Sequence, residues 1–154
     1  MAPAFRIRAE QARRALDLEP GFAIGHLRLG VAYGWLNRYD DALAQLDLGL
    51  RASGGNPGFV AALVRVYATS GREREARRQL AELLDMAKQR YVPAYSIAAA
   101  YAALGDKDAA FMWLERAFEE RSLELTFIGV EPEMDILRAD PRFRDLLRRM
   151  NLPR

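Results

Sequence analysis

A repeating interval of 34 residues is the feature of this sequence that most constrains its fold. Tyr33, Tyr67 and Tyr101 are separated by this interval, and three further columns keep it. Those columns run through Asn37, Gly71 and Gly105, through Ala42, Ala76 and Ala110, and through Leu46, Leu80 and Leu114. A unit of this size cannot bury its own apolar surface, so we expect repeated units to stack on one another and share a core.

Residues 91–121 show what one unit contains. Apolar residues recur every three or four positions before Leu104 and again after Asp106, which is the spacing of one face of an α-helix. Between them, Gly105 can adopt the left-handed conformation that ends a helix, and the Asp106 carboxylate can accept from the free amides that begin the next one. Each unit is therefore predicted to be a hairpin of two helices.

These columns resemble the tetratricopeptide repeat, a family of helical hairpins. The small residue and the Tyr of the family's first helix are matched by Gly30 and Tyr33 and by Ala98 and Tyr101, whereas the first-helix Trp is replaced by His26, Val60 and Ala94. The turn Gly is matched by Gly71 and Gly105, and the second-helix Ala by Ala42, Ala76 and Ala110. The resemblance implies an all-α fold, a right-handed solenoid of helical hairpins with a C-terminal helical cap.

The predicted organisation is a single domain over residues 1–154. Residues 3–20 form a half repeat, residues 21–56, 57–90 and 91–122 form three full repeats, and residues 123–154 form a C-terminal capping segment. Helices are predicted at Pro3–Leu18, Gly21–Leu36, Tyr39–Ala52, Phe59–Ser70, Arg72–Gln89, Val92–Leu104, Asp106–Glu120, Met134–Arg138 and Pro141–Met150. The segment Leu123–Val130 is predicted as either a short helix or an extended packing segment. The half repeat suggests a fragment of a longer protein, or a helix that a second copy covers.

The last thirty or so residues also resemble the C-termini of bacterial regulators that carry tetratricopeptide repeats. The resemblance rests on the run from Ile136 to Pro153. It implies that the chain is the C-terminal module of a bacterial regulatory protein or a stand-alone relative of one.

Composition narrows the classes of function. The net charge is +2 and the chain has no cysteine, which suits a reducing compartment and offers neither disulfides nor thiolate chemistry. No apolar run is long enough to cross a bilayer, and the N-terminus lacks a signal-peptide core. We therefore expect a cytoplasmic protein that does not bind membranes.

The residues that could carry catalysis are few. His26 is the only histidine, and a single helical histidine is more often structural than catalytic or metal-binding. The adjacent pairs Asp40–Asp41 and Glu119–Glu120 point in different directions on a helix, so they do not form an acid and base pair. The loop Gly54–Gly58 lacks the Lys and Ser or Thr of a phosphate-binding loop. We predict no enzyme activity, no cofactor and no metal site.

The resemblance instead implies a concave groove, lined by the first helices, that binds a peptide or a partner protein. Carried over residue by residue, this groove contains Ile24, Leu27, Arg28, Val31, Trp35, Ala61, Arg65, Tyr95 and Ala99. Aromatic and Arg residues are common anchors of binding surfaces, and this set favours an apolar peptide with a carboxylate. The competing interpretations are that Trp35 and Tyr95 only fill space between helices and that the two arginines are only solvated or ion-paired.

Two alternative functions rank below peptide binding. The first is self-association as a homodimer, through the first helix or through the apolar segment Leu123–Val130. The second, ranked last, is nucleic-acid binding through arginine clusters at residues 72–78 and 142–149. Acidic residues are interleaved with both clusters, so a solvated face explains them better.

Overall fold

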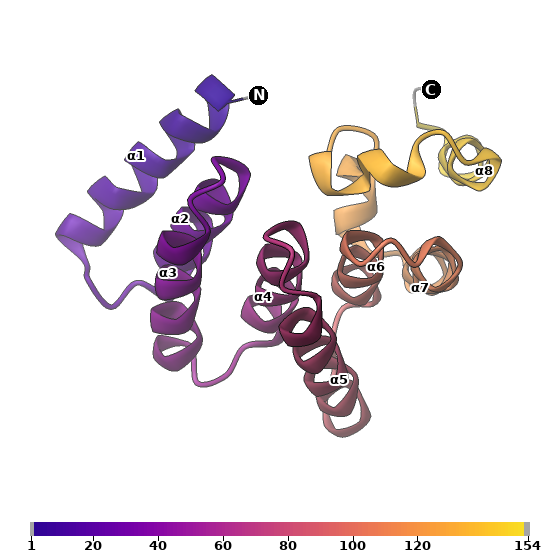
Figure 1. Ribbon diagram of the computed structural model, residues 1–154. Coiled ribbons are helices and arrows are strands. Elements are labelled where there is room, and N and C mark those ends of the chain that lie inside the picture. The colour runs from indigo at the N-terminus through magenta and orange to yellow at the C-terminus, as the bar shows by residue number, and fades with distance from the viewer. Residues whose placement is uncertain (1, 153–154) are drawn as a thin grey trace. The chain divides into compact units, whose positions relative to one another are not determined.

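Helices make up all of the regular secondary structure of residues 2–152, the range that a computed structural model describes (Figure 1). The α-helices are α1 (Ala2–Leu18), α2 (Ala23–Trp35), α3 (Tyr39–Ala52), α4 (Pro57–Thr69), α5 (Glu73–Gln89), α6 (Ala94–Ala103), α7 (Lys107–Glu119) and α8 (Pro141–Arg149). Two 3-10 helices, η1 (Leu123–Phe127) and η2 (Pro132–Leu137), lie between α7 and α8. The prediction of an all-α fold is confirmed.

Most predicted helices lie within two residues of the observed ones. α4 begins two residues earlier than expected, because the Asn56 side chain accepts from the Gly58 backbone N–H at 2.8 Å and Pro57 fits the first helical position. The segment Leu123–Val130 is helical at its start, but as a 3-10 helix.

The chain forms two compact units, and the boundary lies within α5, between Gln79 and Leu80. In the first unit α2 and α3 form a helical hairpin, α1 packs against α2, and α4 packs against both α2 and α3. Leu29, Leu46 and Phe59 are among the side chains buried in the core of this unit.

Two glycines allow the helices of the first unit to approach closely. A methyl group on Gly30 of α2 would lie 2.7 Å from Leu46 Cγ of α3. A methyl group on Gly49 of α3 would lie 2.2 Å from the Phe59 ring of α4 and 2.9 Å from His26 Cβ of α2. Separations under about 3 Å leave no room for a side chain, so glycine at these two positions sets the spacing of α2, α3 and α4.

The three turns that the 34-residue interval marks share one geometry. Asn37, Gly71 and Gly105 have φ angles of 60°, 80° and 78°. The backbone N–H that follows each of them donates to the carbonyl of the repeated tyrosine, at 2.9 Å for Arg38 to Tyr33, 2.8 Å for Arg72 to Tyr67 and 3.0 Å for Asp106 to Tyr101. These bonds close the last turn of α2, α4 and α6. The left-handed helix end predicted at Gly105 is confirmed, and Asn37 and Gly71 share it.

In the second unit α6 and α7 form a hairpin that the C-terminal segment completes. The 3-10 helix η2 contacts α6, and the core joins residues of both helices to Leu125, Ile128, Met134, Leu137, Phe143, Leu146 and Leu147. The predicted N-cap of α7 is present, since the Asp106 carboxylate accepts from the Ala109 backbone N–H at 3.1 Å.

Two arginines of α8 bind α7 in the same way, one heptad apart. The Arg142 guanidinium donates to the Asp108 carboxylate at 2.8 Å and lies 4.3 Å from the centre of the Phe111 ring. The Arg149 guanidinium donates to Glu115 at 2.8 and 2.7 Å and lies 4.6 Å from the Phe118 ring. Each arginine thus combines an ion pair with a cation-π contact, and together they fix the register of α8 on α7.

Replacing Gly105 by Ala should destabilise the second unit by about 1 kcal/mol, because a residue with a Cβ is strained at a positive φ. Chemical denaturation would measure this loss. The matched control is Gly21→Ala, where a Cβ meets no atom within 4 Å and φ is not positive. An equal loss in both variants would contradict the left-handed turn at Gly105.

Acid should loosen the start of α8. Side-chain hydrogen bonds from Arg142, together with its backbone N–H, lower the pKa of Asp140 to about 2. The unfolded chain titrates near pH 4, so this stabilisation is fully present above about pH 4 and is lost as the pH falls through about 2. Amide NMR signals of residues 141–145 should therefore shift over this range in the native chain. In Asp140→Asn that shift should be absent, whereas the control Asp17→Asn should keep it. An unchanged shift in Asp140→Asn would contradict the assignment.

Candidate functional site

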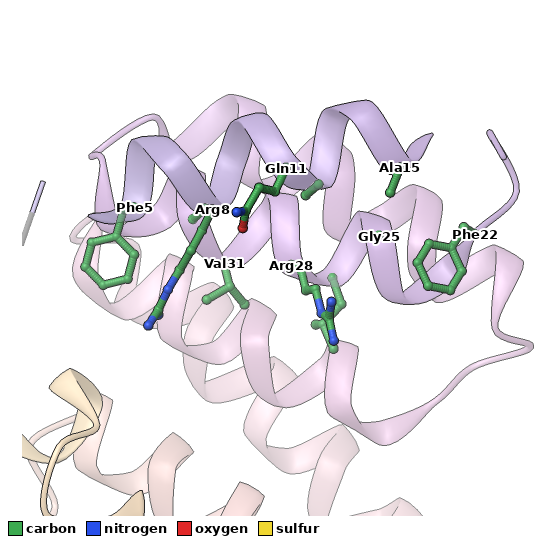
Figure 2. Close-up of a pocket in the computed structure, with 11 residues that line it drawn as sticks. Phe5, Arg8, Gln11, Ala15, Phe22, Gly25, Arg28 and Val31 are labelled. Carbon is green, nitrogen blue, oxygen red and sulfur yellow. The ribbon is translucent and has the colours of Figure 1, made fainter. Parts of the chain in front are cut away.

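A groove of about 480 Å³ lies between α1 and α2 in the first unit (Figure 2). Phe5 and Phe22 lie at its two ends, Arg8 and Gln11 extend from α1, and Arg28 and Val31 extend from α2. Its remaining lining is apolar or small and consists of Ala12, Ala15, Gly25, Leu27 and Ala32. The groove therefore offers a mostly apolar surface with two cationic groups at its rim, one from each helix.

Carboxylates of residues 2–152 leave both of these arginines without an ion pair. Arg8 lies 5.4 Å from the centre of the Phe5 ring, and within residues 2–152 neither Arg8 nor Arg28 forms an ion pair with a carboxylate. Both side chains are exposed. A carboxylate bound in the groove could thus pair with guanidinium groups that have no competing partner in the described chain.

Three of the residues predicted from the sequence, Leu27, Arg28 and Val31, line this groove. Ile24 lies on the same helix and is 41% exposed, but it is outside the groove lining.

The structure places Trp35 against α1. Its ring stacks on the Phe5 ring at 5.4 Å with 16° between the planes, and the Arg65 guanidinium lies 5.6 Å from its centre. Trp35 thus holds the start of α1 on the end of α2, which is the packing role that competed with partner binding in the sequence analysis. Ala61 is half-buried on α4 and does not line the groove.

Tyr95 and Ala99 belong to the second unit. Tyr95 is buried in the core of that unit and Ala99 packs against the same core.

Sequence reasoning missed the contribution of α1. The resemblance placed the groove on first helices only, whereas α1 supplies Phe5, Arg8, Gln11, Ala12 and Ala15. A signal was present in the repeat columns, because Ala12 and Ala15 stand 34 residues before Leu46 and Gly49, which lie on α3.

His26 is engaged at both ring nitrogens and joins three segments of the first unit. Its Nε2–H donates to the Pro20 carbonyl at 2.9 Å, and its Nδ1 lies 2.8 Å from Oε1 of Gln45 on α3. The ring is 9% exposed. These contacts connect the loop before α2 to α3, so both ring nitrogens of His26 are used in contacts within the fold.

A second pocket, of about 420 Å³, lies in the second unit beside Trp113. It also contains cationic side chains, but Lys88 pairs with Asp85 at 3.0 Å and Arg116 pairs with Glu120 at 3.2 Å. The arginine clusters considered for nucleic acid are paired only in part: Arg77 pairs with Glu73 at 2.6 Å, whereas Arg74, Arg78 and Arg144 form no ion pair within residues 2–152. The groove between α1 and α2 differs from these regions in joining two cations that have no carboxylate partner within residues 2–152 to a largely apolar lining.

In residues 2–152 no three His, Asp or Glu side chains converge as metal ligands. None of the helices in that range combines the length and the apolar character needed to cross a bilayer.

Comparison with known proteins gives no assignment. No protein-family model matches the chain, and no curated protein matches it significantly.

Proposed function

We propose that this chain is a tetratricopeptide-type repeat module that binds a partner protein or peptide and belongs to a bacterial regulatory protein. The observation that carries the proposal is the groove between α1 and α2, which is apolar along its length and has Arg8 and Arg28 at its rim. The 34-residue interval supports the repeat assignment, because it recurs in the turn geometry of Asn37, Gly71 and Gly105.

A binding role rather than catalysis is supported by the chemistry of the groove. Its polar groups are two guanidinium groups and one amide, and none of these is a general base near neutral pH. Apolar surface with a few charged groups at its rim is typical of peptide-binding sites, in which the charges orient the ligand and the apolar area supplies affinity.

The test is selection from a random peptide library displayed on phage, followed by affinity measurement on the purified chain. Selected peptides should combine apolar residues with at least one acidic residue. Arg28→Glu should weaken their binding about tenfold, because it replaces an attractive charge by a repulsive one. Arg13→Glu is the matched control, since Arg13 is exposed on α1 outside the groove.

Two results would contradict peptide binding in this groove. One is a library without any peptide that binds, and the other is equal loss of affinity in Arg28→Glu and Arg13→Glu. A steep fall of nucleic-acid affinity with salt, in a chain that binds no peptide, would favour the arginine clusters instead.

Self-association is the second candidate, and the exposure of three apolar side chains favours it. Leu123, Phe127 and Val130 are 81%, 60% and 73% exposed, whereas Leu125 and Ile128 between them are buried. Three exposed apolar side chains within eight residues present apolar area which a second copy could cover.

This candidate predicts a dimer whose dissociation depends on that surface. Light scattering at two concentrations should show a dimer for the native chain and a monomer for the double variant Leu123→Ser and Phe127→Ser. The control Leu48→Ser removes an apolar side chain that is 48% exposed on α3 and should leave the mass unchanged. A native chain that is monomeric at both concentrations would remove the candidate.

A further inference from the structure

The α1 wall of the groove corresponds to the face of α3 that α2 covers. At the 34-residue interval, Arg8, Gln11, Ala12 and Ala15 of α1 correspond to Ala42, Gln45, Leu46 and Gly49 of α3. Ala42 and Leu46 are fully buried, and the tight approach of Gly30 to Leu46 shows that α2 is what covers them. Gln45 contacts His26 of α2 at 2.8 Å. This face of α3 is therefore a surface against which a helix packs, which we call a helix seat.

The α2 wall of the groove corresponds in the same way to α4. Gly25, Arg28 and Ala32 of α2 stand 34 residues before Phe59, Ala62 and Val66 of α4. α4 contacts both α2 and α3, and a methyl group on Gly34 of α2 would lie 3.3 Å from a Val66 methyl. Hence α2 packs against both α3 and α4, and the groove is the corresponding surface formed by α1 and α2.

We infer that the groove binds an amphipathic helix of another protein, placed against α1 and α2 as α2 is placed against α3 and α4. This inference rests on the proposed function and names the class of partner. The two walls of the groove correspond to α3 and α4, and in this chain a helix, α2, packs against those two helices. The main-chain groups within a helix bond to one another, so a bound helix needs to contact the groove through its side chains only.

The groove residues of α1 and α2 differ from the corresponding residues of α3 and α4, and these differences define the chemistry of the partner helix. Ala12 occupies the position of Leu46 and Gly25 that of Phe59, so the groove walls carry smaller side chains than α3 and α4 do. Leu16 and Phe22 lie 3.0 Å from the place of a Gly25 Cβ, so the room for an apolar side chain of the incoming helix is beside Ala12. Arg8 and Arg28 occupy the repeat positions that correspond to the buried residues Ala42 and Ala62. The partner helix must therefore carry bulky apolar residues on one face and a carboxylate beside that face, within reach of these guanidinium groups.

The probe for the test is a fluorescein-labelled peptide with the sequence of residues 22–37, the helix that fills the equivalent seat. It carries G34L to supply apolar bulk and G30E to place a carboxylate near Arg8. Gly30 faces Leu46 and the Ala42 carbonyl in the equivalent seat, and the groove has the smaller Ala12 and Arg8 at those two positions. Fluorescence anisotropy with the full chain should give a Kd below about 100 μM. Arg8→Glu in the chain should weaken binding at least about tenfold, and a peptide with G30K should then bind this variant better than the native chain.

Two controls separate the helical seat from general attraction. Arg13→Glu changes the charge of α1 outside the groove and should leave the affinity of the G30E peptide unchanged. A32P in the peptide breaks the helix in its middle and should abolish binding.

Each contrary outcome overturns the inference in an identifiable way. Equal binding of the A32P peptide would mean that the groove takes an extended segment. Equal loss in Arg8→Glu and Arg13→Glu would mean that binding occurs outside the seat. If this peptide fails while library-selected peptides bind, the helical partner is wrong and the proposed function stands; if neither binds, both are wrong. A dimer of the native chain that Arg8→Glu converts to a monomer would make a second copy the occupant.

Discussion

The close approach of α2 and α3 is the constraint on which the first unit depends. Gly30 lets the Leu46 side chain lie directly on the α2 backbone, and Gly49 receives the Phe59 ring of α4. Because neither glycine has a side chain, two large apolar groups fit where helices cross, and Leu46 and Phe59 are almost completely buried. Any side chain at either glycine would separate the helices and open the core. The absence of a side chain at these two positions therefore sets the spacing of α2, α3 and α4.

The groove arises because the same positions of the repeat are filled differently one interval earlier. Where α3 and α4 present Leu46 and Phe59, α1 and α2 present Ala12 and Gly25. Leu16 and Phe22 fill the space beside Gly25, and the groove lies along the smaller side chains that remain, with Trp35 stacked on Phe5 at one end of α1. Smaller side chains at repeat positions therefore leave a groove where the corresponding surface of α3 and α4 is packed.

The arginines of α8 and those of the groove between α1 and α2 differ in whether a carboxylate of the described chain pairs with them. On α8, Arg142 and Arg149 each combine a carboxylate of α7 with an aromatic ring, so these cations serve the fold. The ion pairs of α5 are local and exposed, and such pairs contribute little to stability or recognition. Arg8 and Arg28 lack carboxylate partners within residues 2–152, and each stands at a position where the next repeat buries an alanine.

The sequence by itself determined the helical hairpins and their ends, because these depend on local interactions. Apolar periodicity, a left-handed residue at Asn37, Gly71 and Gly105, and caps such as Asp106 all act within one turn of helix, and the structure reproduces them. Only the tertiary structure decided which faces remain open. Arg28 and Trp35 are both binding candidates in the sequence, yet Trp35 stacks on Phe5 and Arg28 lines the groove. That difference depends on how α1 lies on α2, a contact between helices that no local pattern in the sequence specifies.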